Sequence, residues 1–160
     1  MSNTNLCAIL LVEDSPEDRE ALVRALRKSG VNNPIYTCED GDEALDYLYQ
    51  RGAFADKATS PRPGLVLLDL NLPGTDGREV LEEIKSQPEL KRIPIVVMTT
   101  SNDPDDVDDC YAAGANSYVQ KPVDLELFVQ TIERIKEFWL SVAILPADLD
   151  LAGQSAFIRV

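Results

Sequence analysis

The chain contains no histidine, and this absence excludes several classes of enzyme. Without an imidazole the protein cannot form a Ser-His-Asp or Cys-His catalytic triad, it lacks the usual histidine-containing zinc sites, and it has no phosphohistidine donor. If the protein handles a phosphoryl group, we expect a carboxylate to hold it.

Cysteine and long apolar runs are also scarce. The three cysteines, Cys7, Cys38 and Cys110, are odd in number and form no Cys-x-x-Cys motif, which favours reduced thiols over a disulfide framework. No run approaches the roughly 20 apolar residues of a membrane helix. The N-terminus lacks the basic start and apolar core of a signal peptide. We therefore expect a cytoplasmic protein without membrane association.

Basic residues are few relative to acidic ones, 15 against 28, which gives a net charge of −13. A protein with this negative charge is repelled by the phosphate backbones of nucleic acids, and we therefore expect no nucleic-acid binding. A length of 160 residues, 44% of them hydrophobic, favours one domain with a substantial core.

The sequence does contain five short apolar runs that alternate with five amphipathic stretches. Ser15-Pro16 and Asp103-Pro104 are typical helix starts, and a last helix is expected over residues 125–142. This alternation predicts an α/β fold with a parallel sheet. The expected strands are residues 8–12, 35–38, 65–70, 95–99 and 117–120.

Acidic side chains directly follow two of these runs. Glu13 and Asp14 come after the first run, and Asp69 follows Leu65-Val66-Leu67-Leu68 of the third. The carboxyl ends of neighbouring parallel strands share one crevice, where ligands bind. Three carboxylates in one crevice need bound protons or a cation, and oxygen-only ligands suit Mg²⁺. The backbone carbonyl of Asn71, two residues beyond Asp69, is placed to complete the metal shell.

Two more strand ends provide a hydroxyl, Thr99, and an ammonium group, Lys121. A carboxylate such as Asp69 can attack a phosphoryl group and hold it as an acyl phosphate, whose oxygens the other two groups would bind. Each residue alone also has an ordinary interpretation, such as a turn former, a strand threonine or a surface lysine. The joint pattern favours a phosphoryl site.

Five aspartates lie between residues 103 and 109, at the start of the expected fourth helix. A calcium site would need the spacing and the glycine of an EF-hand loop, which this segment lacks. We therefore predict a solvated acidic helix face that the helix dipole favours.

Over about residues 6–142 the chain resembles the receiver domains of two-component response regulators. The resemblance rests on the acidic pair, on Asp69 and the motifs downstream of it, and on the last two strand ends, that is, Glu13, Asp14, Asp69, Pro73, Asp76-Gly77, Thr99 and Lys121-Pro122. It implies a doubly wound, flavodoxin-like sheet of five parallel strands in the order 2-1-3-4-5.

The resemblance also implies a metal site and a covalent modification. Mg²⁺ would be held by Asp14, Asp69 and the carbonyl of Asn71, with Glu13 acting through bound water. Asp69 would receive a phosphoryl group from a histidine of a sensor kinase.

The resemblance further implies a conformational switch. After phosphorylation Thr99 would move toward the phosphoryl group, and an aromatic residue would turn inward behind it. The matching aromatic residue in this sequence is Tyr118, three positions before Lys121.

A narrower resemblance concerns the small response regulators paired with cyanobacterial and bacterial phytochromes. The stretches Asp-Leu-Asn-Leu-Pro, Asp-Gly-Arg-Glu-Val-Leu and Glu-Phe-Trp-Leu-Ser-Val are similar to theirs. This resemblance implies that the upstream kinase is a red-light sensor of the phytochrome type.

The last helix is apolar over more than one face, and such a helix needs a second partner. We therefore expect a homodimer, with an interface around Phe128, Ile132, Ile135, Phe138 and Trp139. We expect residues 1–146 to form a single receiver domain and residues 147–160 a flexible tail, with no output domain. Output would then be a protein–protein contact or onward transfer of the phosphoryl group.

Two alternatives to a phosphorylated receiver stay open at this stage. One is a receiver-like scaffold that is never phosphorylated. The other is an aspartyl-phosphate hydrolase, but those enzymes use an Asp-x-Asp motif whose second acid is Asn71 here, and no insertion resembles a lid. A flavin or dinucleotide binder is disfavoured because no glycine-rich turn follows the first strand. We therefore expect a phosphoacceptor and not a turnover enzyme.

Overall fold

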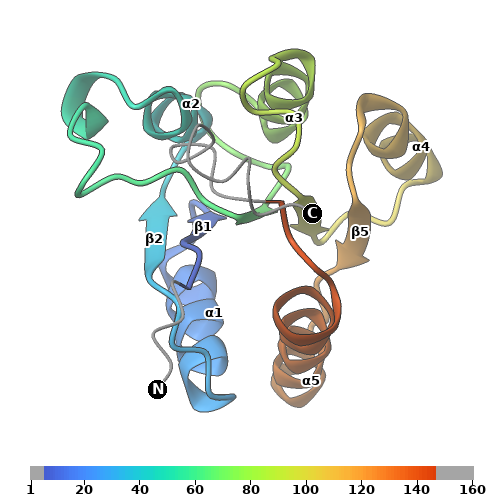
Figure 1. Cartoon of the computed structure of the whole chain (residues 1–160). Helices are drawn as coiled ribbons and strands as arrows, with labels where there is room; N and C mark the ends of the chain where they lie inside the picture. The colour runs from blue at the N-terminus through green and yellow to red at the C-terminus, as the bar shows by residue number, and fades with distance from the viewer. Residues whose placement is uncertain (1–5, 147–160) are drawn as a thin grey trace.

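A computed structural model describes residues 6–146 of the chain. Five parallel strands form one sheet in the order β2-β1-β3-β4-β5, and five α-helices connect and cover them (Figure 1). The predicted fold class and strand order are confirmed. The strands are β1 (Ile9–Val12), β2 (Ile35–Cys38), β3 (Leu65–Leu68), β4 (Ile95–Thr99) and β5 (Ser117–Gln120).

The helices lie on both faces of the sheet. Helices α1 and α5 pack on one face with one core cluster, and α2, α3 and α4 pack on the other face with a second cluster (Figure 1). This layering is the doubly wound arrangement that alternating strands and helices predict. The helices are α1 (Pro16–Lys28), α2 (Gly41–Tyr49), α3 (Gly77–Ser86), α4 (Pro104–Ala113) and α5 (Leu125–Glu137).

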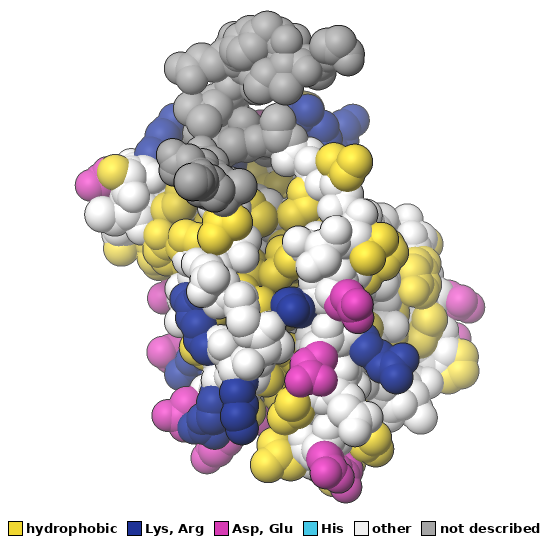
Figure 2. All heavy atoms as spheres, turned by 60° about the horizontal axis from the view of Figure 1, so that its bottom comes forward, with side chains coloured by type: hydrophobic (Ala, Val, Ile, Leu, Met, Phe, Trp, Pro, Cys, Tyr) yellow, Lys and Arg dark blue, Asp and Glu magenta, His cyan; other side chains and the backbone are white. Residues whose placement is uncertain are grey.

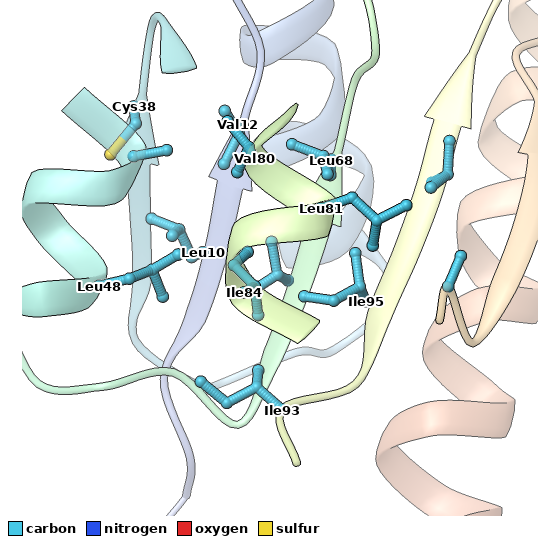
Figure 3. Packing of buried hydrophobic residues seen from close by; sticks show 14 of the residues in the cluster. Leu10, Val12, Cys38, Leu48, Leu68, Val80, Leu81, Ile84, Ile93 and Ile95 are labelled. Carbon is cyan, nitrogen blue, oxygen red and sulfur yellow. The ribbon is translucent and has the colours of Figure 1, made fainter. Parts of the chain in front are cut away.

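Strand β1 shows why the apolar runs are nearly continuous. Leu10 and Val12 point toward α2 and α3 (Figure 3), whereas Ile9 and Leu11 belong to the cluster under α1 and α5. Because both faces of the strand are covered, every one of its four side chains is buried.

The ends of the helices have the local chemistry that the sequence predicts. The Ser15 hydroxyl accepts a hydrogen bond from the backbone of Asp18 and caps α1. Asp103 caps α4 in the same way, and Gly114 ends that helix with φ at 112°. The two N-terminal caps fix where α1 and α4 begin and so limit the length of the turns that follow β1 and β4.

Helix α3 begins directly against the turn after β3. A Cβ atom on Gly77 would lie 2.2 Å from the backbone oxygen of Asp69 and 2.6 Å from Cα of Leu70. Only a residue without a side chain allows this approach, so Gly77 helps to set the position of the Asp69 segment.

The last described helix differs in part from the prediction. Helix α5 runs to Glu137 and continues as a π-helical segment, η2 (Phe138–Val142). Phe128, Ile132 and Ile135 are buried against the sheet, so they cannot also line the predicted dimer interface. An apolar stripe on a helix does not reveal which part of it the sheet covers, and these three positions correct the prediction.

The outer surface near the end of the chain retains apolar groups. Phe138 is 51% exposed, while the half-buried Trp139 packs at the margin of the cluster under α1 and α5. Residues 147–160, the predicted tail, lie outside the described residues. No helix within residues 6–146 is long and apolar enough to cross a membrane.

Candidate functional site

Three carboxylates come together at the carboxyl end of the sheet. Glu13, Asp14 and Asp69 each offer an oxygen, and these oxygens all lie within 4.8 Å of one another. The register explains this proximity, because Val12 pairs with Leu68 in adjacent parallel strands and the acids follow directly. Glu13 and Asp69 are buried, whereas Asp14 is exposed. The site is therefore closed on its inner side and open to solvent at Asp14.

Lys121 reaches the same place from the end of β5. Its ammonium Nζ donates to Oε1 of Glu13 at 2.5 Å and to Oδ2 of Asp69 at 3.2 Å. A third bond, 3.0 Å long, goes to Oδ2 of Asp18 in the first turn of α1. Lys121 thus binds groups from the β1–α1 segment and from the end of β3, which lie 108, 103 and 52 positions from it in the sequence.

Asp18 is a member of the site that sequence analysis missed. It is 103 positions from Lys121 in the chain, and its side chain is 43% exposed. Its place three residues after the Ser15 cap, in the helix turn next to the acidic pair, is the only indication in the sequence that it faces the site.

Burial shapes the charge state of these groups. Burial, with a smaller contribution from the charge of Asp69, raises the pKa of Glu13 to about 7, although the hydrogen bond from Lys121 opposes the change. Burial lowers the pKa of Lys121, but its hydrogen bonds with Glu13 and Asp18 and the charge of Asp69 outweigh this effect and raise it. Lys121 is therefore a permanent cation at neutral pH.

The donor set fits a hard divalent cation. Glu13, Asp14 and Asp69 offer oxygen ligands only, and the single ammonium group of Lys121 does not neutralise three acids. Small divalent cations such as Mg²⁺ bind through a few carboxylates together with water and phosphate oxygens.

The structure places the remaining predicted residues around this cluster. Thr99 is completely buried at the end of β4, and its backbone carbonyl accepts a bond of 2.7 Å from the backbone of Lys121. The backbone N–H of Asn71 donates to Oδ1 of Asp69 at 3.2 Å. Tyr118 is half-buried, packs against the core cluster under α4, and donates from its hydroxyl to the Ser101 carbonyl at 3.0 Å.

One member of the acidic segment before α4 behaves differently from the prediction. Asp106 is not part of a fully solvated face, because its carboxylate accepts hydrogen bonds from Ser101 and from Arg78 of α3. Arg78 is 28 positions away in the sequence and lies next to Asp106 only because α3 and α4 are neighbours in the fold.

Comparison with known proteins identifies the family. Residues 9–133 match the response regulator receiver domain. The chain belongs to this family. Receiver domains are signalling modules of two-component systems, and the predicted family is confirmed.

Similar proteins share most of the length of this receiver domain. Response regulator Rcp1 of Synechocystis sp. is 45% identical over 139 residues, which are 87% of this chain and 92% of Rcp1. The crystal structure of the phosphorylated cyanobacterial phytochrome response regulator RcpA is also similar, with 47% sequence identity and a TM-score of 0.84. The match covers 89% of this chain and 99% of the RcpA chain.

A Mn²⁺-bound crystal structure of Rcp1 is also similar. It is 45% identical with a TM-score of 0.83 and covers 88% of this chain and 99% of that one. The predicted resemblance to phytochrome response regulators is therefore confirmed. A divalent metal in Rcp1 agrees with the acidic cluster of this receiver domain.

Proposed function

We propose that this receiver domain accepts a phosphoryl group on Asp69 from a histidine of a phytochrome-type sensor kinase. The observation that carries the proposal is the convergence of three carboxylates and Lys121 at one end of the sheet. The relatives support the choice of kinase, since RcpA is a phytochrome response regulator whose structure is phosphorylated. The protein acts as a phosphoacceptor and not as a turnover enzyme.

Asp14, Asp69 and the backbone carbonyl of Asn71 would hold the metal, which we propose is Mg²⁺, with Glu13 acting through bound water. When bound, Mg²⁺ supplies positive charge that offsets the carboxylates and the entering phosphoryl oxygens. Burial raises the pKa of Glu13 to about 7, and a cation bound beside it would favour the ionised carboxylate.

The transfer itself uses the carboxylate of Asp69 as the nucleophile. One of its oxygens forms a bond to phosphorus while the bond from phosphorus to the donor histidine nitrogen breaks, and that nitrogen keeps the electron pair and takes up a proton. Two contacts orient the carboxylate, one from Lys121 to Oδ2 and one from the Asn71 backbone to Oδ1. Because Asp69 is buried on its inner side, the donor must approach from solvent.

Thr99 and Lys121 then bind the phosphoryl oxygens, the first with its hydroxyl and the second with its ammonium group. Tyr118 reports the change at the surface of the domain, because its ring lies between the core and the β4–α4 loop. The output is a protein–protein contact or onward transfer of the phosphoryl group, carried by residues 1–146 as a single receiver domain.

The homodimer belongs to this proposal in a corrected form. The exposed groups of η2, Phe138 and Val142, line the interface in place of the buried residues of α5. Figure 2 shows the face of the molecule on which α1 and α5 lie. Apolar, acidic and basic side chains are interspersed over this face.

The test is to incubate the full chain with Mg²⁺ and acetyl phosphate and to measure its intact mass. We expect one added phosphoryl group on the wild type and none on Asp69→Asn or without Mg²⁺. Asp105→Asn, an exposed aspartate in the first turn of α4, is the matched control and should be modified like the wild type. A wild type that stays unmodified with acetyl phosphate and with a phytochrome kinase would favour the scaffold alternative.

A further inference from the structure

A polar network outside the acidic cluster joins α3 to α4. Arg78 places Nε and Nη2 each 2.9 Å from Oδ1 of Asp106, and its Nη1 donates to Oδ2 of Asp76 at 3.0 Å. The other oxygen of Asp106, Oδ2, accepts from the Ser101 hydroxyl at 2.7 Å. Hydrogen bonds from Ser101 and then from Arg78 lower the pKa of Asp106, which keeps this carboxylate ionised. The network therefore consists of charged partners at neutral pH.

Ser101 connects this network to both residues of the proposed switch. Its backbone N–H points to the Thr99 hydroxyl at 3.5 Å, and its carbonyl accepts the bond from the Tyr118 hydroxyl. Its side chain donates to Asp106 and accepts from the backbone of Asp103 at 3.2 Å. A shift of Ser101 would therefore change the surroundings of Thr99 and Tyr118 together.

We propose that the Arg78–Asp106 ion pair is a latch that positions Ser101 and so favours the half-buried position of Tyr118, in which its hydroxyl is bonded to the Ser101 carbonyl. Arg78 and Asp106 are thus positioning residues for the phosphoryl switch, and this inference rests on the proposed roles of Thr99 and Tyr118. A contact can bias a two-state equilibrium only by the difference in its energy between the states. The ion pair is made in the arrangement described here, in which Tyr118 is half-buried and its hydroxyl is bonded to the Ser101 carbonyl. We expect the pair to weaken when Tyr118 and Ser101 move, so that its removal favours arrangements in which Tyr118 is displaced.

The geometry distinguishes this latch from an ordinary surface pair. The planar guanidinium of Arg78 is held between two carboxylates, and the Asp106 side chain is only 19% exposed. The Arg24–Glu20 pair on α1 is a useful contrast, because it has a separation of 3.6 Å and both partners are mostly exposed. Such an exposed pair contributes little to stability. Arg24→Ala is therefore the matched control for Arg78→Ala.

The first measurement follows Tyr118 without any phosphoryl donor. The full chain is labelled with 3-fluorotyrosine, and the fluorine resonance of Tyr118 is assigned with Tyr118→Phe. We expect Arg78→Ala to move this resonance toward the position of a solvent-exposed tyrosine. Arg78→Lys should restore the resonance in part, because lysine keeps the positive charge but lacks the planar guanidinium group. Arg24→Ala should leave it unchanged. The resonance of the buried Tyr47 in each variant shows that the fold is intact.

The second measurement is the rate at which acetyl phosphate modifies Asp69. We expect Arg78→Ala to slow the modification about two- to fivefold, the size of a partly exposed ion pair, with Arg78→Lys intermediate. An unmoved Tyr118 resonance, or a wild-type rate in Arg78→Ala, would overturn the latch. A wild type without any adduct would instead overturn the proposed function, and a moved resonance would still support the latch. The two failures are therefore distinguishable.

Discussion

At the scale of single residues, Lys121 is the cation that offsets the cost of burying the acidic groups Glu13 and Asp69. It contacts Glu13, Asp18 and Asp69, and its side chain is only 6% exposed. Removing one partner from such a buried pair leaves an uncompensated charge, which costs more than the pair itself contributes.

We predict that Lys121→Ala lowers the free energy of unfolding by about 3–5 kcal/mol without Mg²⁺. We also predict that Mg²⁺ restores more stability to this variant than it adds to the wild type, because the ion then replaces the missing ammonium charge. Urea unfolding with and without Mg²⁺ measures both effects, and Lys57→Ala, in an exposed loop, is the control. Equal Mg²⁺ effects on the wild type and Lys121→Ala would contradict a shared site.

A second prediction concerns Gly77, where an added Cβ would lie against the backbone of Asp69 and Leu70. An added methyl group must displace that backbone, so Gly77→Ala should cost about 1–3 kcal/mol and slow the modification of Asp69 by acetyl phosphate. Gly30→Ala separates the two effects, because Gly30 has a φ of 91° but no atom near its missing Cβ. It should lose stability and keep the rate of the wild type.

The sequence made some site residues predictable and hid others. Asp69 and Lys121 directly follow apolar runs, so the rule for the ends of parallel strands places them in one crevice. Asp18 and Asp106 lie inside helices, and their partners come from elsewhere in the chain. Which side of a helix turn meets a distant side chain depends on tertiary packing, which local patterns do not encode.

At the scale of elements, α5 shows how far periodicity can be interpreted. The apolar pattern correctly indicates a long last helix, and its width suggests more than one contact surface. The apolar pattern does not show which residues of the stripe contact the sheet and which face outward. The packing shows this, since Ile132 is completely buried whereas Phe138 is half exposed.

We predict a matching division in stability. Ile132→Ala should lower the free energy of unfolding of the monomer by about 2–5 kcal/mol, because it leaves a cavity between α5 and the sheet. Phe138→Ala should cost no more than about 1.5 kcal/mol, because Phe138 is half exposed and its ring packs edge-on against Trp139. Urea unfolding at protein concentrations below dimer formation makes the comparison. A loss of equal size in both variants would place Phe138 in the core of the monomer.

At the scale of the whole molecule, the topology was predictable because separate features of the sequence indicated the same fold. Apolar runs, helix caps and glycine stops all indicated the same five repeats, and the strand order followed from the family resemblance. Association between copies is different, because no intramolecular pattern specifies it. There the net charge of −13 opposes whatever the exposed apolar groups contribute.

We predict that the chain forms a homodimer through Phe138 and Val142 and that added salt strengthens it. Two copies each carrying a charge of −13 repel one another, and raising the ionic strength from about 0.05 to about 0.5 M shortens the range of that repulsion to a few ångströms. Sedimentation velocity over a concentration series measures the dimer. Phe138→Asp should abolish it, because the new charge would be buried in the interface. Val123→Asp, at a fully exposed position away from η2, should leave the dimer intact apart from a small electrostatic weakening. Dimers that persist in Phe138→Asp, or that dissociate as salt is added, would place the interface on a different, charge-paired surface.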